Sequence, residues 1–374
     1  MALFGPISLY LPKTPEALVI QAYASYSKEK RAADLQLRPH SFLSILRAGT
    51  EANTQQAQWQ HIAEAFQAAC NAKRFVAHPA NYWVLRRKSK RGVFTGLITG
   101  MTATAVKAGK LRPHEATLPD RAATLGGYLT AVKIQAEPVV AAFSSTPALQ
   151  DLLEEVTHHL PLHEFSYDAV TYTLWPLNAR QSAACHHALA AIDHCDLVDG
   201  HHRAEAVIHY SNQTGNSSNT QLLTLLVPAE QIQSESFFWS LPQLPSEISL
   251  EALSRLGSLQ TLPKQLVPSK KHPLLLLLEG TPYSLHPHNS TLDSLQKLYQ
   301  MISATGVQLR YHPRKKNQAL TDFTAVNPSA FCCSYLPLPF VLVQQLAANG
   351  KTVPPKTTFL HPKLLTGHLV HPMQ

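Results

Sequence analysis

The stretch that most constrains the fold of this chain is residues 197–206, LVDGHHRAEA. Its first residues predict a short apolar strand, Gly200 supplies a sharp turn, and residues 202–210 keep helical spacing. A strand that turns directly into a helix aims backbone N–H groups and the positive end of a helix dipole at one place, which favours phosphate binding. The alternative interpretation of this stretch is a polar loop that precedes a capped helix.

The side chains of this turn strengthen the phosphate interpretation. Arg203 adds a planar cationic fork that matches phosphate oxygens. Asp199, at the end of the strand, can hold Mg²⁺ or orient a nucleophile. His201 and His202 are adjacent and cannot point the same way, so we expect one to face the ligand and the other to support the turn.

Length and charge set the class of protein. A chain of 374 residues is long enough for two domains, and 45% hydrophobic with 15% charged residues is a globular composition that excludes a disordered chain. The net charge of +8 permits anionic ligands such as nucleotides. Because the 32 basic residues are scattered, a nucleic-acid partner is not expected.

Cysteine usage and hydropathy indicate the compartment. The five cysteines lack the spacing of a disulfide framework, which favours reduced thiols and a cytoplasmic protein. Residues 1–13 do not resemble a signal peptide, and the longest purely apolar run, residues 274–278, is too short to cross a bilayer. We therefore expect no membrane association. No pattern in the sequence specifies an oligomeric state.

Strand and helix patterns alternate along the chain and predict an α/β or mixed α+β fold. An amphipathic helix is expected within residues 51–73 and a strand at 41–46. Residues 82–98 predict a hairpin whose cationic tip, residues 86–91, is interpreted as a solvated turn rather than a nucleic-acid contact. The proline-rich residues 228–272 are expected to be irregular, with one short helix.

Two further segments carry candidate chemistry. Glu115 follows a proline and His114, a plausible setting for a general base, although an isolated glutamate of this kind is more often a surface acid. Lys356, Thr357 and Thr358 follow two prolines that hold the chain extended, which fits a clamp for a phosphorylated ligand. The alternative for this segment is a loop stiffened by its prolines.

Six histidines lie within residues 186–209 and raise the alternative of a metal-dependent hydrolase. A zinc site usually has closer local ligand spacing, such as two histidines four apart, with cysteine or carboxylate partners, and this spacing is missing. The adjacent Cys332 and Cys333 are expected in a buried strand with their side chains on opposite faces.

The three motifs KLRPHE (110–115), VDGHHR (198–203) and PKTT (355–358) occur in a recognisable order. This order resembles the ParB-like free serine kinases, whose archaeal member uses ADP to phosphorylate L-serine. Over nearly the whole chain the sequence is similar to the bacterial family known as domain of unknown function 1015. The shorter segments that carry this likeness are SFL (41–43), TGL (95–97), HEAT (114–117), DR (120–121), TLW (173–175) and FLHPKL (359–364).

The resemblance implies a fold and a reaction. The fold is a ParB/sulfiredoxin-like α/β core with additional strands and helices, and the reaction is nucleotide-dependent phosphorylation of a small hydroxylated metabolite, with free L-serine the first choice. ADP or ATP would be the phosphate donor. The alternative is a ParB-like nucleotide-binding regulator or DNA-associated protein without kinase activity, for which the basic tip at residues 86–91 is the sequence support.

The resemblance also implies roles for individual residues. Glu115 would be the catalytic base, with His114 and Arg121 in support, and Asp199 would lie near Mg²⁺. The nucleotide phosphates would be held by residues of the turn and of the clamp: Gly200, His201, His202, Arg203, Lys356, Thr357 and Thr358.

The resemblance divides the chain into residues 1–212, which carry the motifs at 110–121 and 198–206, and residues 213–374, which carry the clamp. The sequence departs from the bacterial family at several positions. Where the family has Pro-Pro-Tyr-Asp, residues 24–27 keep only Tyr26, Ala204 replaces an aromatic residue, and the segment before residue 120 is shorter. If the lost prolines and acid shape the acceptor pocket, the acceptor differs from serine or activity is lost.

Overall fold

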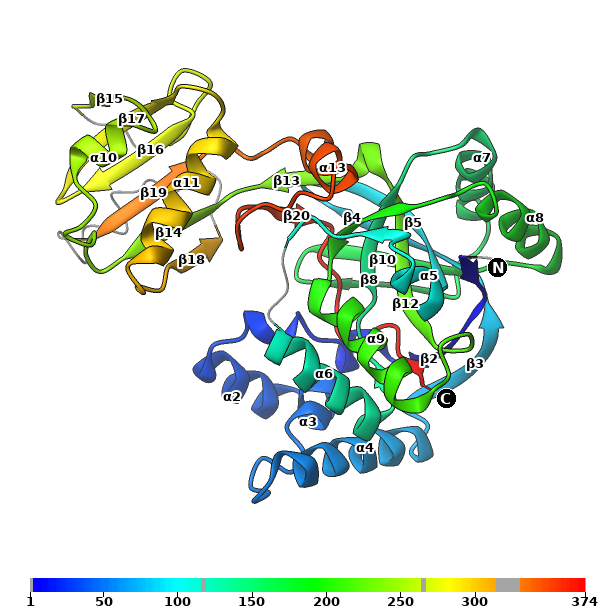
Figure 1. The fold of residues 1–374 in the computed structure, drawn as a ribbon. Helices are drawn as coiled ribbons and strands as arrows, with labels where there is room; N and C mark the ends of the chain where they lie inside the picture. Colours follow the sequence, from blue (N-terminus) through cyan, green and yellow to red (C-terminus); the bar gives the residue numbers. More distant parts are fainter. Residues whose placement is uncertain (1–2, 116–118, 264–266, 314–329, 374) are drawn as a thin grey trace. The chain divides into compact units, whose positions relative to one another are not determined.

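A computed structural model describes residues 3–115, 119–263, 267–313 and 330–373 (Figure 1). The chain is a mixed α/β protein, as the sequence predicts, and it divides into two compact units. Unit 1 consists of residues 1–113, 117–232 and 362–374, and unit 2 of residues 114–116 and 233–361. No helix in the described ranges is long and apolar enough to cross a membrane.

A nine-stranded mixed sheet forms the centre of unit 1, in the order β6-β11-β8-β12-β5-β4-β10-β9 with β1 paired to β5. The central strand β12 pairs with both β8 and β5. The strands are β1 (Phe4–Gly5), β4 (Trp83–Ser89), β5 (Gly92–Thr102), β6 (Leu111–Arg112), β8 (Val139–Phe143), β9 (His163–Tyr167), β10 (Val170–Pro176), β11 (Cys195–Asp199) and β12 (Gln221–Pro228).

This central position of β12 sets the first boundary between the units. The sequence places a boundary after residue 212, which would remove β12 from its sheet. In the structure unit 1 continues through η2 (Ala229–Gln231) to residue 232, because β12 supplies buried residues between two neighbouring strands. Unit 1 also includes the C-terminal residues 362–374, which the sequence division assigned to the second part of the chain.

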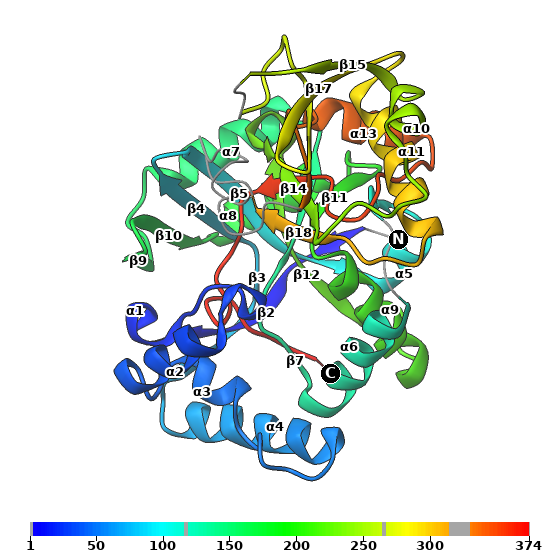
Figure 2. The same cartoon turned by 90° about the vertical axis from the view of Figure 1, so that its left-hand side faces the viewer.

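Helices of unit 1 bury one face each against this sheet and against one another. Side-chain caps start several of them; Asn178 and Gln181 form a reciprocal capping box, for example. The helices α6 and α9 lie side by side in both views (Figures 1 and 2). The helices are α5 (Ala103–Lys107), α6 (Pro119–Val132), α7 (Pro147–Thr157), α8 (Ala179–Leu189) and α9 (His201–Thr214).

The N-terminal part of unit 1 adds a helical layer with its own core. Its amphipathic helix α4 (Gln55–Asn71) is confirmed, with Ile62 and Phe66 buried. The expected strand at 41–46 is wrong: residues 42–46 form helix α3, because their apolar side chains pack against α4 and the β3 strand rather than into a sheet. The remaining elements are α1 (Pro15–Leu18), η1 (Tyr23–Ser25), α2 (Lys28–Leu37), α3 (Phe42–Leu46), and the paired strands β2 (Ile7–Pro12) with β3 (Phe75–Asn81) and β7 (Ile134–Gln135) with β21 (His371–Pro372).

Unit 2 is built on a six-stranded antiparallel sheet in the order β15-β17-β16-β19-β14-β18, and α10 and α11 pack on one face of it. Cys333 faces that core and Cys332 the opposite one, as expected. The elements are β13 (Gln233–Glu235), β14 (Phe237–Leu241), α10 (Leu250–Ser254), β15 (Gly257–Thr261), β16 (Leu274–Leu278), β17 (Thr281–Pro287), α11 (Thr291–Ala304), β18 (Arg310–Pro313), β19 (Phe331–Tyr335), α13 (Phe340–Ala348) and β20 (Phe359–His361), which pairs with β13.

The expectation of an irregular segment at 228–272 is therefore wrong. It contains β13, β14 and β15 besides the short helix α10. Its prolines 242, 245, 263 and 268 lie in the connections, where a missing N–H costs no ladder hydrogen bond. A high proline content in this segment therefore does not indicate irregular structure.

Candidate functional site

The predicted strand–turn–helix is present at the end of β11. Gly200 has φ of +98°, and a Cβ at this position would lie 2.8 Å from Val139 Cγ1 and 2.9 Å from Arg203 Nε. Glycine is therefore required both for the backbone conformation and for the close approach of the arginine side chain. The helix α9 starts at the next residue, so its N-terminus lies beside the Asp199 carboxylate.

Asp199 is held by two cations. One carboxylate oxygen, Oδ1, accepts a hydrogen bond from Lys363 Nζ, and Oδ2 accepts one from Arg203 Nη2 at 2.6 Å. Burial by itself would raise the pKa of Asp199, but the charges of Lys363 and Arg203 outweigh it and keep the pKa well below its usual range. Asp199 is therefore ionised and committed to its cationic neighbours.

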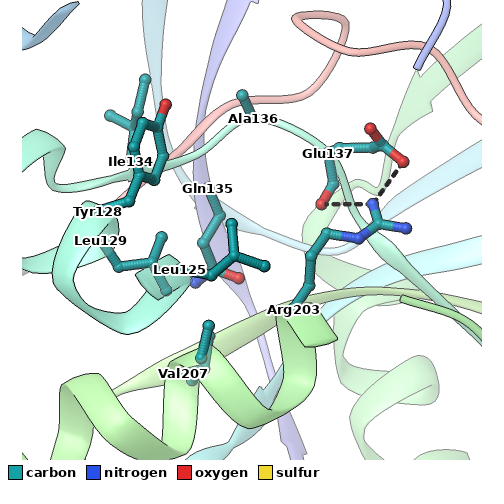
Figure 3. Close-up of a pocket in the computed structure, with 10 residues that line it drawn as sticks. Leu125, Tyr128, Leu129, Ile134, Gln135, Ala136, Glu137, Arg203 and Val207 are labelled. Atoms are coloured by element: carbon teal, nitrogen blue, oxygen red, sulfur yellow. Dashed lines mark hydrogen bonds and ion pairs between the residues drawn. The ribbon is translucent and has the colours of Figure 1, made fainter. Parts of the chain in front are cut away.

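Arg203 in turn is held by Glu137 (Figure 3). Its Nη1 lies 2.6 Å from Glu137 Oε1 and donates to the Pro138 carbonyl at 2.8 Å. Burial would lower the pKa of Arg203, but Glu137 and Asp199 more than offset this and raise it. Thr366 Oγ1 donates to the other Glu137 oxygen at 2.9 Å, so the guanidinium belongs to a charge network fixed at both ends.

We call this set, Lys363, Asp199, Arg203 and Glu137, the turn network. Its two acids and two bases leave no net charge at neutral pH. Both oxygens of Asp199 already accept hydrogen bonds from cations, so this carboxylate does not fit the role of a metal ligand as arranged here. Across the described ranges, no group of three or more His, Cys, Asp or Glu side chains is placed to hold a metal ion.

A cavity of about 120 Å³ lies beside the turn network in unit 1. Leu125 and Tyr128 of α6 and Val207 of α9 form its apolar wall, and the Arg203–Glu137 ion pair closes its polar end (Figure 3). Such a cavity can take a small apolar group next to an ion pair.

Arg121, which was predicted as a supporting residue, is exposed in the first turn of helix α6.

Unit 2 brings together the other predicted residues. The Val353 N–H donates to the His114 carbonyl at 2.8 Å, and Glu115 forms a parallel bridge with Val353. His114 is buried, and its Nε2 lies 3.2 Å from Thr358 Oγ1. The KLRPHE motif therefore contacts the PKTT motif through His114 and Thr358, which are 244 residues apart in the sequence. Residues 116–118, which follow the KLRPHE motif, lie outside the described ranges.

The clamp segment has a strained backbone. Lys356 has φ of +55°, the left-handed conformation that residues with a side chain adopt at a cost of about 1 kcal/mol or more. Its carbonyl accepts hydrogen bonds from Trp239 Nε1 at 3.2 Å and from the Tyr335 hydroxyl at 3.4 Å. The same hydroxyl donates to the Thr357 carbonyl at 3.1 Å. Two fully buried aromatic side chains therefore fix the clamp.

Glu115 lies close enough to two tyrosines to affect their ionisation. Burial, together with the charges of Tyr299 and Glu115, raises the pKa of Tyr311 to about 12. Burial and neighbouring groups, among them Glu115, raise the pKa of Tyr335 well above its usual value. The candidate base therefore shares its surroundings with neutral hydroxyls that lie on the sheet of unit 2.

A sequence model of DUF1015, described as a protein of unknown function, matches residues 6–307. The chain belongs to the DUF1015 family. A comparison with curated proteins finds no match. In this DUF1015 protein the Tyr26 hydroxyl donates to Asp34 Oδ2 at 3.1 Å in a partly buried polar cluster.

Several solved structures are similar to this DUF1015 protein. SbnI with C-terminal truncation from Staphylococcus aureus has a TM-score of 0.46 at 12% identity, covering 74% of this chain and 87% of its own. Free serine kinase in complex with AMP has a TM-score of 0.43 at 13% identity, covering 74% and 91%. A mutant of free serine kinase in complex with ADP has 0.44 at 13%, covering 74% and 92%.

The structure adds residues that local sequence patterns did not assign. Lys363 and Glu137 complete the turn network, and Trp239 and Tyr335 support the clamp. A signal was available for Lys363 alone, because it lies in the closing FLHPKL segment that carries the family resemblance. Nothing near Glu137 or Tyr335 in the sequence indicates their partners, which are 66 and 22 residues away.

Proposed function

We propose that this DUF1015 protein is a nucleotide-dependent kinase of a small hydroxylated metabolite, with free L-serine as the first acceptor to test. The observation that carries the proposal is the contact of His114 with Thr358 and of Glu115 with Val353 in unit 2, because it brings the segment of the candidate base against the segment that carries the lysine and the two threonines. The ordered motifs that resemble the ParB-like free serine kinases support the same reaction.

The turn in unit 1 is the proposed binding element for the nucleotide phosphates. Its support is the N-terminus of the 14-residue helix α9, the glycine that Arg203 approaches closely, and the two cations gathered by Asp199. Because Asp199 does not fit a metal ligand, its proposed role is to hold Arg203 and Lys363 in place. The donor is either ADP or ATP, and the assay must distinguish between the two.

The chemical step needs one proton acceptor and one leaving group. The Glu115 carboxylate takes the proton of the acceptor hydroxyl as that oxygen forms a bond to the terminal phosphorus of the donor. The bond from this phosphorus to the bridging oxygen breaks, and the nucleotide leaves with one phosphate fewer. Positioning and charge stabilisation supply most of the rate in reactions of this type.

Phosphorus NMR on the purified protein tests the proposal, with L-serine and either ADP or ATP in a magnesium-containing buffer. We expect a phosphoserine signal with one donor. Glu115→Gln should lower the rate by about a thousandfold while nucleotide affinity stays unchanged. Glu64→Gln, an exposed glutamate on α4, is the matched control. Normal turnover by Glu115→Gln would refute the assigned base.

Three other outcomes separate the alternatives. Nucleotide binding that Arg203→Met weakens, without transfer to any hydroxylated acceptor, would replace the kinase with a nucleotide-binding regulator. Duplex DNA binding that weakens steeply with salt would add a nucleic-acid partner to that regulator. Absence of nucleotide binding would overturn the phosphate role of residues 199–203.

A further inference from the structure

A second and larger cavity, of about 440 Å³, lies in unit 1 away from the turn network. Its walls come from the hairpin strands β4 and β5, from helix α7 and from the short helix η2. Polar and charged side chains dominate the lining, which includes Arg86, Thr95, Glu154, Thr157, Glu230 and Gln231. The three motifs KLRPHE, VDGHHR and PKTT do not line this cavity, and the proposed kinase reaction does not use it.

Arg86 is the fixed cation of the cavity. Its guanidinium carbon lies 5.6 Å from the centroid of the Trp175 ring, and its Nε donates to Thr95 Oγ1 at 3.3 Å. Among the described residues no carboxylate lies within ion-pair distance of Arg86. The side chain is thus oriented by a ring and a hydroxyl while its charge stays without a counter-ion, the arrangement in which a guanidinium binds a carboxylate in two-point fashion.

The cavity also holds two acids. Glu154 comes from α7 and Glu230 from η2, and neither forms an ion pair within the described part of the chain. Gln150 Nε2 donates to Glu230 at 3.5 Å, the limit for a hydrogen bond. Opposite charges that line one cavity without pairing with each other complement a ligand that carries both charges.

Sheet register separates this cavity from the turn network. On strand β8, Val140 pairs with Asp199 at one end, whereas Phe143 pairs with Pro228 at the other. Pro228 lines the cavity and leads directly into η2. The cavity and the turn network therefore lie at opposite ends of strand β8, so a ligand bound at one does not occupy the other.

We propose that this cavity binds a small zwitterion that carries a carboxylate and an ammonium group, a free α-amino acid being the simplest case. Arg86 binds the carboxylate, and Glu154 and Glu230 bind the ammonium. The Gln231 side chain, which accepts the Thr95 N–H at 2.8 Å, fixes the wall between them. A volume of about 440 Å³ holds an amino acid with several waters. This inference is independent of the proposed kinase function.

Isothermal titration with the twenty standard amino acids tests the proposal on the full chain. We expect at least one to bind, and its carboxamide and its N-acetyl derivative, which each lack one charge, to bind at least about tenfold more weakly. Arg86→Met and Glu230→Gln should each weaken binding by about the same factor. Lys90→Met, at the hairpin turn, and Asp151→Asn, on the exposed side of α7, are matched controls that should change nothing.

Three results would overturn the inference: no amino acid binds, the carboxamide and the N-acetyl derivative bind as tightly as the amino acid, or Arg86→Met and Glu230→Gln bind as the wild type does. Binding that is lost in Glu115→Gln and kept in Arg86→Met would place the amino acid at the proposed acceptor site. That result refutes this inference and leaves the kinase proposal standing. Glu230 is exposed, so Glu230→Gln is expected to fold even if Arg86→Met does not.

Discussion

The turn network and the clamp segment hold their predicted functional residues by different physical means. In the turn network, alternating charges hold Asp199 and Arg203, and each charge has an oppositely charged neighbour. In the clamp segment, neutral donors on Trp239 and Tyr335 hold the backbone carbonyls, and the functional lysine itself takes a strained conformation. Ion pairs maintain the structure of the turn network, whereas buried hydrogen bonds and packing maintain that of the clamp segment.

This difference predicts how each region responds to perturbation. A charge network is sensitive to pH and to the loss of a single member, because each remaining charge then lies partly buried without compensation. Hydrogen bonds from buried aromatic side chains do not titrate near neutral pH, and the pKa of Tyr335 is raised further by its burial. The clamp should therefore keep its geometry under conditions that loosen the turn.

The largest expected effect is that of Asp199→Asn. The substitution leaves the Lys363 and Arg203 charges without their shared carboxylate, and we expect it to lower the free energy of unfolding by about 3 kcal/mol. Urea unfolding measures the change. Asp193→Asn is the control, because it removes an exposed ion pair with Lys110 and should leave the midpoint unchanged. Equal midpoints for both variants would show that the turn is held by packing alone.

A second prediction concerns pH. The pKa of Asp199 is lowered in the folded protein, so its contribution to stability is complete above its unfolded pKa near 4 and is lost as the pH falls through the folded value. Urea unfolding between about pH 6 and about pH 2 should therefore show the wild type and Asp199→Asn converging on acidification. A stability difference that stays constant over this range would contradict the charge-based account of the turn.

The sequence predicted the turn well because its determinants are contiguous. An apolar strand, a glycine and a helical pattern within 14 residues define both the backbone and the position of Asp199 and Arg203. The partners that decide their charge state come from elsewhere, with Lys363 164 residues away from Asp199. No local rule indicates which of 32 basic residues approaches a given carboxylate.

The conformation of the clamp segment was harder to predict from the sequence than that of the turn. The expected extended conformation is wrong, because residues 355–356 form a turn in which the Thr357 N–H donates to the Pro354 carbonyl at 3.2 Å. The left-handed conformation of Lys356 had no signal in the sequence, since lysine is not a residue that favours it. The strain is tolerated because Trp239 and Tyr335, on strands β14 and β19, determine the carbonyl positions. One of these strands lies in the proline-rich segment expected to be irregular, so this support was not predictable without the fold.

Tyr335→Phe tests the buried support of the clamp. It removes one hydroxyl and leaves the carbonyl of Thr357 without a donor, and we expect a loss of about 1 to 2 kcal/mol in unfolding free energy that does not vary between about pH 5 and about pH 8. Tyr299→Phe, which removes a hydroxyl from another ring that packs on Trp239, is the control and should cost less. A loss that depends on pH in this range would indicate that the clamp too is held by charge.

The smallest expected effect concerns the strain at Lys356. Lys356→Gly and Lys356→Ala both remove the ammonium group, but only glycine relaxes at φ of +55°, so the glycine variant should be about 1 kcal/mol more stable than the alanine variant. Lys351, which has no positive φ, gives the matched pair in which alanine should be the more stable. Urea unfolding of the four variants measures both differences. If glycine confers no advantage at position 356, the left-handed backbone is not a source of strain, and the contrast with the turn network rests on the aromatic hydrogen bonds alone.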